Sequence, residues 1–138
     1  MPRSGGAVIR MQSTSEKINF LIGSKEILEG MAEIPTQEPF SDDIVEFFTE
    51  VSLKLLSSKE VKLYPDVMAY AFWIRRSSFE REKKNYNFVG QRTGRGIAFQ
   101  IAPSNIPVQF AVSMTYALIA GNASIVRVSN KEFTQVGI

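Results

Sequence analysis

Residues 94–107 read GRGIAFQIAPSNIP. The apolar part of this run is typical of a strand, it ends in a Pro-Ser-Asn-Ile-Pro turn, and an apolar helical pattern follows. Ala120-Gly121-Asn122 then opens a second β-branched run, Ala123 to Val128. This order predicts one βαβ unit over about residues 95–129. Ligands of open α/β sheets bind at the carboxyl ends of the strands, so we expect a ligand site at the end of the first strand.

The predicted helix, about Val108 to Ile119, contains no charged residue. A helix that is apolar nearly all round is normally buried on more than one side. Covering it needs more protein than 138 residues readily supply. We therefore expect an incomplete α/β domain, in which a helical lead-in precedes the βαβ unit.

The composition is that of a globular domain, with 44% hydrophobic and 22% charged residues. A net charge of +2 is too small to indicate nucleic-acid binding, although the pI is about 9.0. No apolar run approaches the roughly 18 to 20 residues of a membrane span. The N-terminus carries a charge but no long apolar core, which argues against a signal peptide. These features favour a cytoplasmic protein.

Two residue types are absent from the chain. Without cysteine it has no disulfide, no thiolate metal site and no cysteine nucleophile. Without histidine it lacks the Ser-His-Asp triad, His-ligated zinc and the commonest general base near neutral pH. We therefore predict no metal site, and Ser104 has no histidine to activate it as a nucleophile.

The segments before the βαβ unit are predicted to be mostly helical. Residues 1–16 form a flexible lead-in rich in Gly, Ser and Thr, and residues 17–138 form the partial domain. A short apolar run over Ile18–Gly23 is typical of a strand, and the two prolines of residues 34–39 predict a loop.

Two helices are then expected. Ser41 supplies an N-cap for a helix that fades at Ser57-Ser58, and Pro65 suits the first position of the next. The buried side of that second helix is predicted to consist of Val67, Tyr70, Ala71 and Ile74.

The C-terminal third resembles the aldehyde dehydrogenase superfamily, which has Ile-x-Pro-Trp-Asn-x-Pro, a helix, Ala-Gly-Asn and a strand ending in Lys-Pro. The matching text here is Ile101 to Pro107, Ala120 to Asn122 and Ile125 to Ser129. Serine at the Trp position, together with Tyr64 to Arg76, is similar to the long-chain fatty acyl-CoA reductases that make aldehyde for bacterial luciferase. The resemblance covers about residues 40–138, and it implies a Rossmann-type cofactor domain.

The resemblance implies roles for seven residues. Asn105 matches the asparagine whose side-chain amide donates to the oxyanion formed from the thioester, a catalytic role. Arg127 stands where many relatives have a lysine that contacts the adenosine ribose. Its guanidinium could also bind a 2′-phosphate, which favours NADPH and leaves NADH as the alternative. The residues assigned to cofactor binding are Ile101, Ala102, Pro103, Ser104, Arg127 and Ser129.

The departures from the family are as informative as the matches. The family nucleophile is a cysteine, and the family's glutamate base and Gly-rich cofactor turn lie in elements that are not found here. The sequence thus resembles the N-terminal portion of such an enzyme, a fragment inactive by itself. The full enzyme would take acyl-CoA or another acyl-thioester, form homo-oligomers and work beside an acyl-activating partner enzyme. The alternative is a non-catalytic nucleotide-binding or assembly module.

Each signal also has a purely structural interpretation. Asn105 could cap a helix that starts at Ile106 or Pro107, and Gly121-Asn122 could be a left-handed turn that ends the helix. Arg127 could be an ordinary charge at a strand end. A cluster of basic residues could bind nucleic acid or coenzyme phosphates, but it is more typical of a solvated helix face: Arg75, Arg76, Arg81, Lys83 and Lys84.

Overall fold

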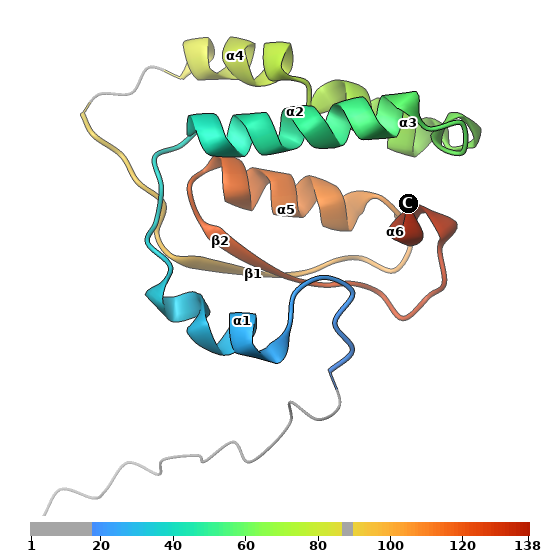
Figure 1. The fold of residues 1–138 in the computed structure, drawn as a ribbon, viewed down its shortest axis with the longest axis horizontal. Coiled ribbons are helices and arrows are strands. Elements are labelled where there is room, and N and C mark those ends of the chain that lie inside the picture. The colour runs from blue at the N-terminus through green and yellow to red at the C-terminus, as the bar shows by residue number, and fades with distance from the viewer. Residues whose placement is uncertain (1–17, 87–89) are drawn as a thin grey trace, which may run out of the picture. The chain divides into compact units, whose positions relative to one another are not determined.

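The computed structural model describes residues 18–86 and 90–138 (Figure 1). They fall into two compact units, one ending at Met31 and the other spanning Ala32–Ile138. The predicted flexible lead-in, residues 1–16, lies outside the described residues. No helix of the described part is both long and apolar enough to cross a membrane.

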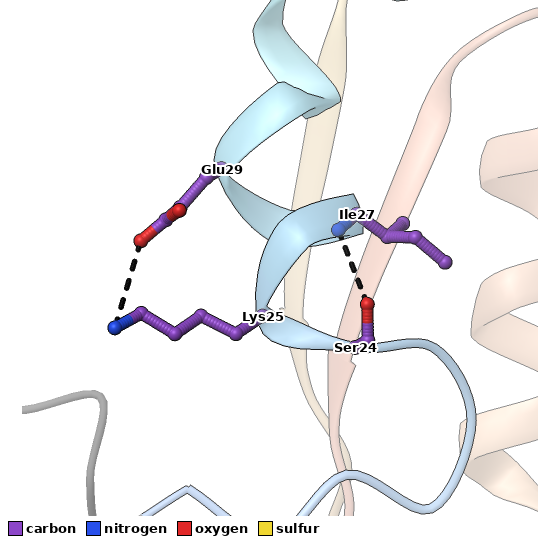
Figure 2. A network of polar contacts seen from close by, with 4 residues as sticks. All are labelled: Ser24, Lys25, Ile27 and Glu29. Carbon is purple, nitrogen blue, oxygen red and sulfur yellow. Dashed lines mark hydrogen bonds and ion pairs between the residues drawn. The ribbon is translucent and has the colours of Figure 1, made fainter.

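The described part of the first unit contains one short helix, α1 (Lys25–Gly30). The Ser24 hydroxyl caps it by accepting from the Ile27 N–H at 3.3 Å, and Lys25 pairs with Glu29 at 3.9 Å (Figure 2). The Ser24 side chain also lowers the pKa of the Glu26 carboxyl through a hydrogen bond.

The strand predicted over Ile18–Gly23 is wrong. These residues form coil and bends, and Gly23 has a φ of +88°. Ile22 is 90% exposed, and the segment pairs with no strand in the described chain. An apolar run without a neighbouring strand has no ladder to complete, which a pattern of single residues does not reveal.

The second unit contains five α-helices, two strands and two short 3₁₀ turns among its described residues. In chain order they are η2 (Met31–Glu33, which begins in the first unit), α2 (Asp42–Ser57), η3 (Val61–Leu63), α3 (Pro65–Trp73), α4 (Arg76–Asn85), β1 (Ile97–Ile101), α5 (Gln109–Ile119), β2 (Ala123–Arg127) and α6 (Thr134–Gly137).

The two predicted helix starts and the end of α2 follow the sequence signals, but the second expected helix is divided, and its charged tail belongs to the separate helix α4. Helix α2 begins after Ser41 and ends at Ser57, and α3 begins at Pro65, as predicted. Ser41 occupies the N-cap position without capping, because its Oγ donates to the Gln37 Oε1 at 2.7 Å. The predicted buried side of α3 is confirmed, since its four residues are all buried.

The two strands are parallel, with α5 as their crossover, so the predicted βαβ unit is confirmed. The register runs from Ile97 opposite Ala123 to Ile101 opposite Arg127. Helix α5 lies between this sheet and the helices α2 and α3 (Figure 1). The fold is therefore a small mixed domain, mostly helical, with a two-stranded parallel sheet.

The core lies mainly between α5 and the helices stacked over it. Phe48, Val61 and Ile74 are fully buried, and the Phe48 ring packs against Phe79 at 5.8 Å between centroids. Two hydrogen bonds made by buried hydroxyls link the helices. The Ser52 Oγ donates to the Ala71 carbonyl at 2.7 Å, and the hydroxyls of Tyr70 and Thr115 lie 2.9 Å apart.

The tyrosine of this second link makes stability depend on alkaline pH. Burial raises the pKa of Tyr70 above its ordinary value, and the Thr115 hydrogen bond opposes that change. Below a pH of about 10 both the folded and unfolded chains carry the neutral phenol. Above it the unfolded chain ionises first, so the free energy of unfolding falls as the pH rises.

We expect Tyr70→Phe to lose part of this alkaline sensitivity. The measurement is urea unfolding at pH values of about 8 and 10.5. Tyr116→Phe is the matched control, because Tyr116 is 61% exposed. An identical pH dependence in wild type and Tyr70→Phe would contradict the expectation.

Candidate functional site

The carboxyl ends of β1 and β2 lie side by side. Ile101 is opposite Arg127 in the register, and the Ala102 N–H donates to the Arg127 carbonyl oxygen at 2.9 Å. The structure therefore brings together two sets of predicted cofactor-binding residues that are far apart in sequence. The β1–α5 loop starts at this point and leads into α5.

Asn105 lies in this loop, ahead of the helix. Helix α5 begins at Gln109 and its N-cap is Val108, so the interpretation of Asn105 as a helix cap is wrong. The Asn105 side chain is exposed and makes no hydrogen bond within the described chain. Its amide is thus available to a ligand at the strand end.

The other predicted site residues are placed along the same edge. Pro103 and Ser104 are exposed in the loop, and Arg127 is exposed at the end of β2, where its guanidinium has no ion pair among the described residues. Ser129 is half-buried, and its Oγ accepts from the Lys131 N–H at 3.1 Å. This bond gives Ser129 a role in shaping its own turn.

The Ala-Gly-Asn turn lies at the opposite, amino end of the sheet. Gly121 has a φ of +87°, as expected for a left-handed turn after a helix. The Asn122 Oδ1 accepts from the Arg95 N–H at 2.6 Å and the Gly96 N–H at 3.3 Å. The structural interpretation of Gly121-Asn122 fits these contacts.

Gln37 is a residue whose importance the sequence does not reveal. Its N–H donates to the Gly121 carbonyl at 3.0 Å, and its own carbonyl accepts from the Gly94 N–H at 2.9 Å. It thereby joins the proline-rich loop to both glycine turns of the βαβ unit. A loop residue without periodicity gives no signal for such a contact. The available signals for a structured loop are the prolines on either side of Gln37 and the glycines that it contacts, Gly94 and Gly121.

A cavity of about 540 Å³ lies elsewhere in this unit, lined by residues 37–43, Lys83 and residues 90–92. None of the predicted site residues lines it. Its lining mixes acidic and basic groups, and the Lys83 Nζ donates to the Phe40 carbonyl at 3.3 Å. We place the candidate site at the strand ends, because the backbone of Ala102 is bonded to that of Arg127 there and the loop that carries Asn105 begins at the same point.

The basic cluster is partly engaged in local contacts. Arg75 lies over the Phe72 ring at 4.9 Å and donates to the Phe72 carbonyl, and Arg81 pairs with Glu82 at 3.9 Å. These contacts favour a solvated helix face over a binding surface. Among the described residues no group of three or more acidic side chains could hold a metal ion.

Comparison with known proteins adds one match to this geometry. No curated protein and no solved structure matches the chain significantly. The sequence profile of the acyl-CoA reductase (LuxC) family matches residues 24–136, which include both strands, α5 and the loop that carries Asn105. The resemblance seen in the sequence is confirmed at this level, and the chain belongs to the acyl-CoA reductase (LuxC) family.

Proposed function

We propose that this chain supplies one wall of the site at which an acyl-CoA reductase binds a nicotinamide cofactor and an acyl thioester. The observation that carries the proposal is the paired strand end, where Ala102 is hydrogen-bonded to Arg127 and the Asn105 loop begins. The N-terminus of α5 follows this loop, and the partial positive charge at the N-terminus of a helix favours anionic ligands. Cofactor sites of α/β proteins are built from these same elements.

The residues present fit a phosphorylated cofactor. Arg127 offers an exposed guanidinium at the end of β2, and a guanidinium can bind a phosphate through paired hydrogen bonds. Ile101 to Ser104 form an open strand end against which a flat ring could lie. A bound nicotinamide cofactor supplies the hydride that reduces the acyl group to the aldehyde. We infer NADPH in preference to NADH.

Asn105 has the chemistry that the thioester carbonyl requires. Negative charge develops on this oxygen when a nucleophile attacks the carbonyl carbon, and an amide N–H placed beside it stabilises that charge. The carboxamide has two N–H donors and needs no change of protonation. We propose that one of them donates to the oxyanion.

The nucleophile must come from outside these 138 residues, which contain no cysteine. In the proposed reaction a cysteine thiolate attacks the acyl-CoA carbonyl carbon, and the thiolate of coenzyme A leaves. Reduction of the resulting acyl thioester releases the aldehyde and regenerates the cysteine thiolate. This chain alone is therefore proposed to be inactive. Homo-oligomers, an acyl-activating partner enzyme and a cytoplasmic location stay predictions from the resemblance.

The cofactor proposal is tested by measuring the affinity of the chain for NADPH and NADH calorimetrically. Hydrogen bonds to a charged group contribute about 1.5–3 kcal/mol, so we expect Arg127→Leu to weaken NADPH binding roughly 10- to 100-fold. NADH affinity should change little, because NADH lacks the 2′-phosphate. Arg76→Leu, an exposed basic residue of α4, is the control for net charge.

Three outcomes distinguish the alternatives. Equal losses of NADPH and NADH affinity in Arg127→Leu would rule out recognition of the 2′-phosphate. No binding of either nucleotide to the wild-type chain would overturn the proposal that this strand end is a cofactor wall. Nucleotide binding without acyl-CoA reduction, in a longer protein that carries this sequence and a cysteine, would favour the non-catalytic module.

A further inference from the structure

We propose that Asn122 is a positioning residue, which fixes the register of β1 against β2 and so aligns the strand ends that carry the site. This inference rests on the proposed function for its catalytic meaning. The register itself rests only on contacts within the second unit. Asn122 lies at the amino end of the sheet and does not touch the site.

The side-chain pattern of β1 leaves its register incompletely defined. Ala98 and Gln100 lie on the face covered by α5, whereas Ile97, Phe99 and Ile101 are 44–65% exposed on the other face. A slip by one residue would exchange these faces, so the pattern excludes it. A slip by two residues would keep every residue on its own face, so the alternation does not exclude it. That slip would displace one strand end from the other by about 6.6 Å.

Hydrogen bonds of the Asn122 side chain define the register that the side-chain pattern leaves open. It directly precedes β2, and its Oδ1 accepts from two successive N–H groups directly before β1, those of Arg95 and Gly96. The Ala123 N–H donates to the Gly96 carbonyl at 2.9 Å in the same turn. One side chain at the start of β2 thus holds the start of β1. A two-residue slip would break all three bonds.

The pairing at the far end depends on this alignment. The bond from Ala102 to the Arg127 carbonyl forms only in the observed register. A second link comes from the Gln100 Nε2, which donates to the Ser113 carbonyl of α5 at 2.9 Å. Because this link remains, loss of Asn122 should loosen the strand ends without unfolding the domain.

Hydrogen exchange of individual amides tests the proposal on the 138-residue chain. In Asn122→Ala we expect the Ala102 amide to exchange at least about tenfold faster, as do amides whose local opening becomes easier. The Ile74 amide, bonded to the Tyr70 carbonyl in the helical layer, should keep its rate. Asn122→Asp retains an acceptor oxygen and should restore slow exchange at Ala102. Asn130→Ala, at an exposed asparagine, is the matched control.

The outcomes separate the register proposal from a local role. Faster exchange of Arg95 and Gly96 with an unchanged Ala102 amide would overturn the proposal, since Asn122 would then hold only its own turn. Failure of Asn122→Asp to restore Ala102 would overturn it as well. If Asn122→Ala raises the exchange rate of the Ile74 amide as much as that of the Ala102 amide, Asn122→Gln is measured in place of the alanine variant. Glutamine keeps the amide but moves the acceptor by one methylene, and the same two criteria apply.

NADPH affinity distinguishes failure of this proposal from failure of the proposed function. If the positioning role and the proposed function are both correct, Asn122→Ala weakens NADPH binding and Asn122→Asp restores it, although residue 122 does not touch the cofactor. If wild-type chain binds no NADPH while the exchange rates change as expected, the positioning role stands and the proposed function fails. If wild type binds NADPH and Asn122→Ala binds it equally well, the positioning role fails alone.

Discussion

Gly121→Ala is expected to lower the free energy of unfolding of the Ala32–Ile138 unit by about 3–5 kcal/mol. Two effects add at this position. Gly121 has a φ of +87°, where a non-glycine residue costs about 1–3 kcal/mol. A Cβ on Gly121 would also overlap the carbonyl oxygen of Gln37, which is backbone and cannot rotate away. Moving that carbonyl breaks its hydrogen bond with the Gly94 N–H.

The chain offers a matched set of variants that separates the two effects. Gly94 lacks a positive φ, but a Cβ there would overlap the Gly121 carbonyl. Gly96 has a φ of +131° but open space around it, and Gly137 has neither feature. We expect Gly137→Ala to change stability by less than about 1 kcal/mol, and Gly96→Ala to cost about 1–3 kcal/mol. Gly94→Ala should report the overlap alone.

Urea unfolding monitored by the fluorescence of Trp73 gives the four free energies. The strain and overlap terms should add roughly, so that the loss at Gly121 approaches the sum of those at Gly94 and Gly96. If Gly121→Ala proved as harmless as Gly137→Ala, the contact between the loop of Gln37 and the two glycine turns would be wrong.

Helices α2, α3 and α5 and the two strands could be predicted because their signals are local. Pro65 at the start of α3 and Ser57 at the end of α2 act through the backbone of their own neighbours. The apolar run of β1 and the uncharged run of α5 are likewise local signals. The strand predicted over Ile18–Gly23 failed for the complementary reason. Whether an apolar run becomes a strand depends on a partner that the run does not contain.

The candidate site likewise contains features that follow from local sequence signals and others that depend on distant contacts. Ile101 and Arg127 could be placed at one edge from the strand order alone, because parallel strands joined by one helix end on the same side. The contacts of Gln37 with Gly94 and Gly121 join a loop to two distant turns. No spacing rule encodes such a contact. The two acceptor bonds of Asn122 are hidden for a related reason, since an Asn after Gly in a turn already has a sufficient local explanation.

Asn105→Ala is expected to lower the turnover of a reductase that carries this sequence by about 10²–10³, the usual effect of removing one oxyanion donor. NADPH affinity should stay nearly unchanged, because the proposed donor faces the substrate oxygen. Stability should change by less than about 0.5 kcal/mol, since the side chain is exposed and forms no hydrogen bond within the described chain. Steady-state kinetics with an acyl-CoA, nucleotide affinity and urea unfolding measure the three quantities.

The choice of replacement decides between oxyanion stabilisation and a role in shaping the loop. Asn105→Asp has nearly the same shape but offers a negatively charged acceptor in place of a donor, so it should reduce turnover at least as much as alanine. If the loop conformation mattered instead, the aspartate variant would keep more activity than alanine. Asn130→Ala controls for substitution of an exposed asparagine elsewhere. A loss of NADPH affinity with unchanged turnover would reassign Asn105 to cofactor binding, because the strand end borders both ligands in the proposed site.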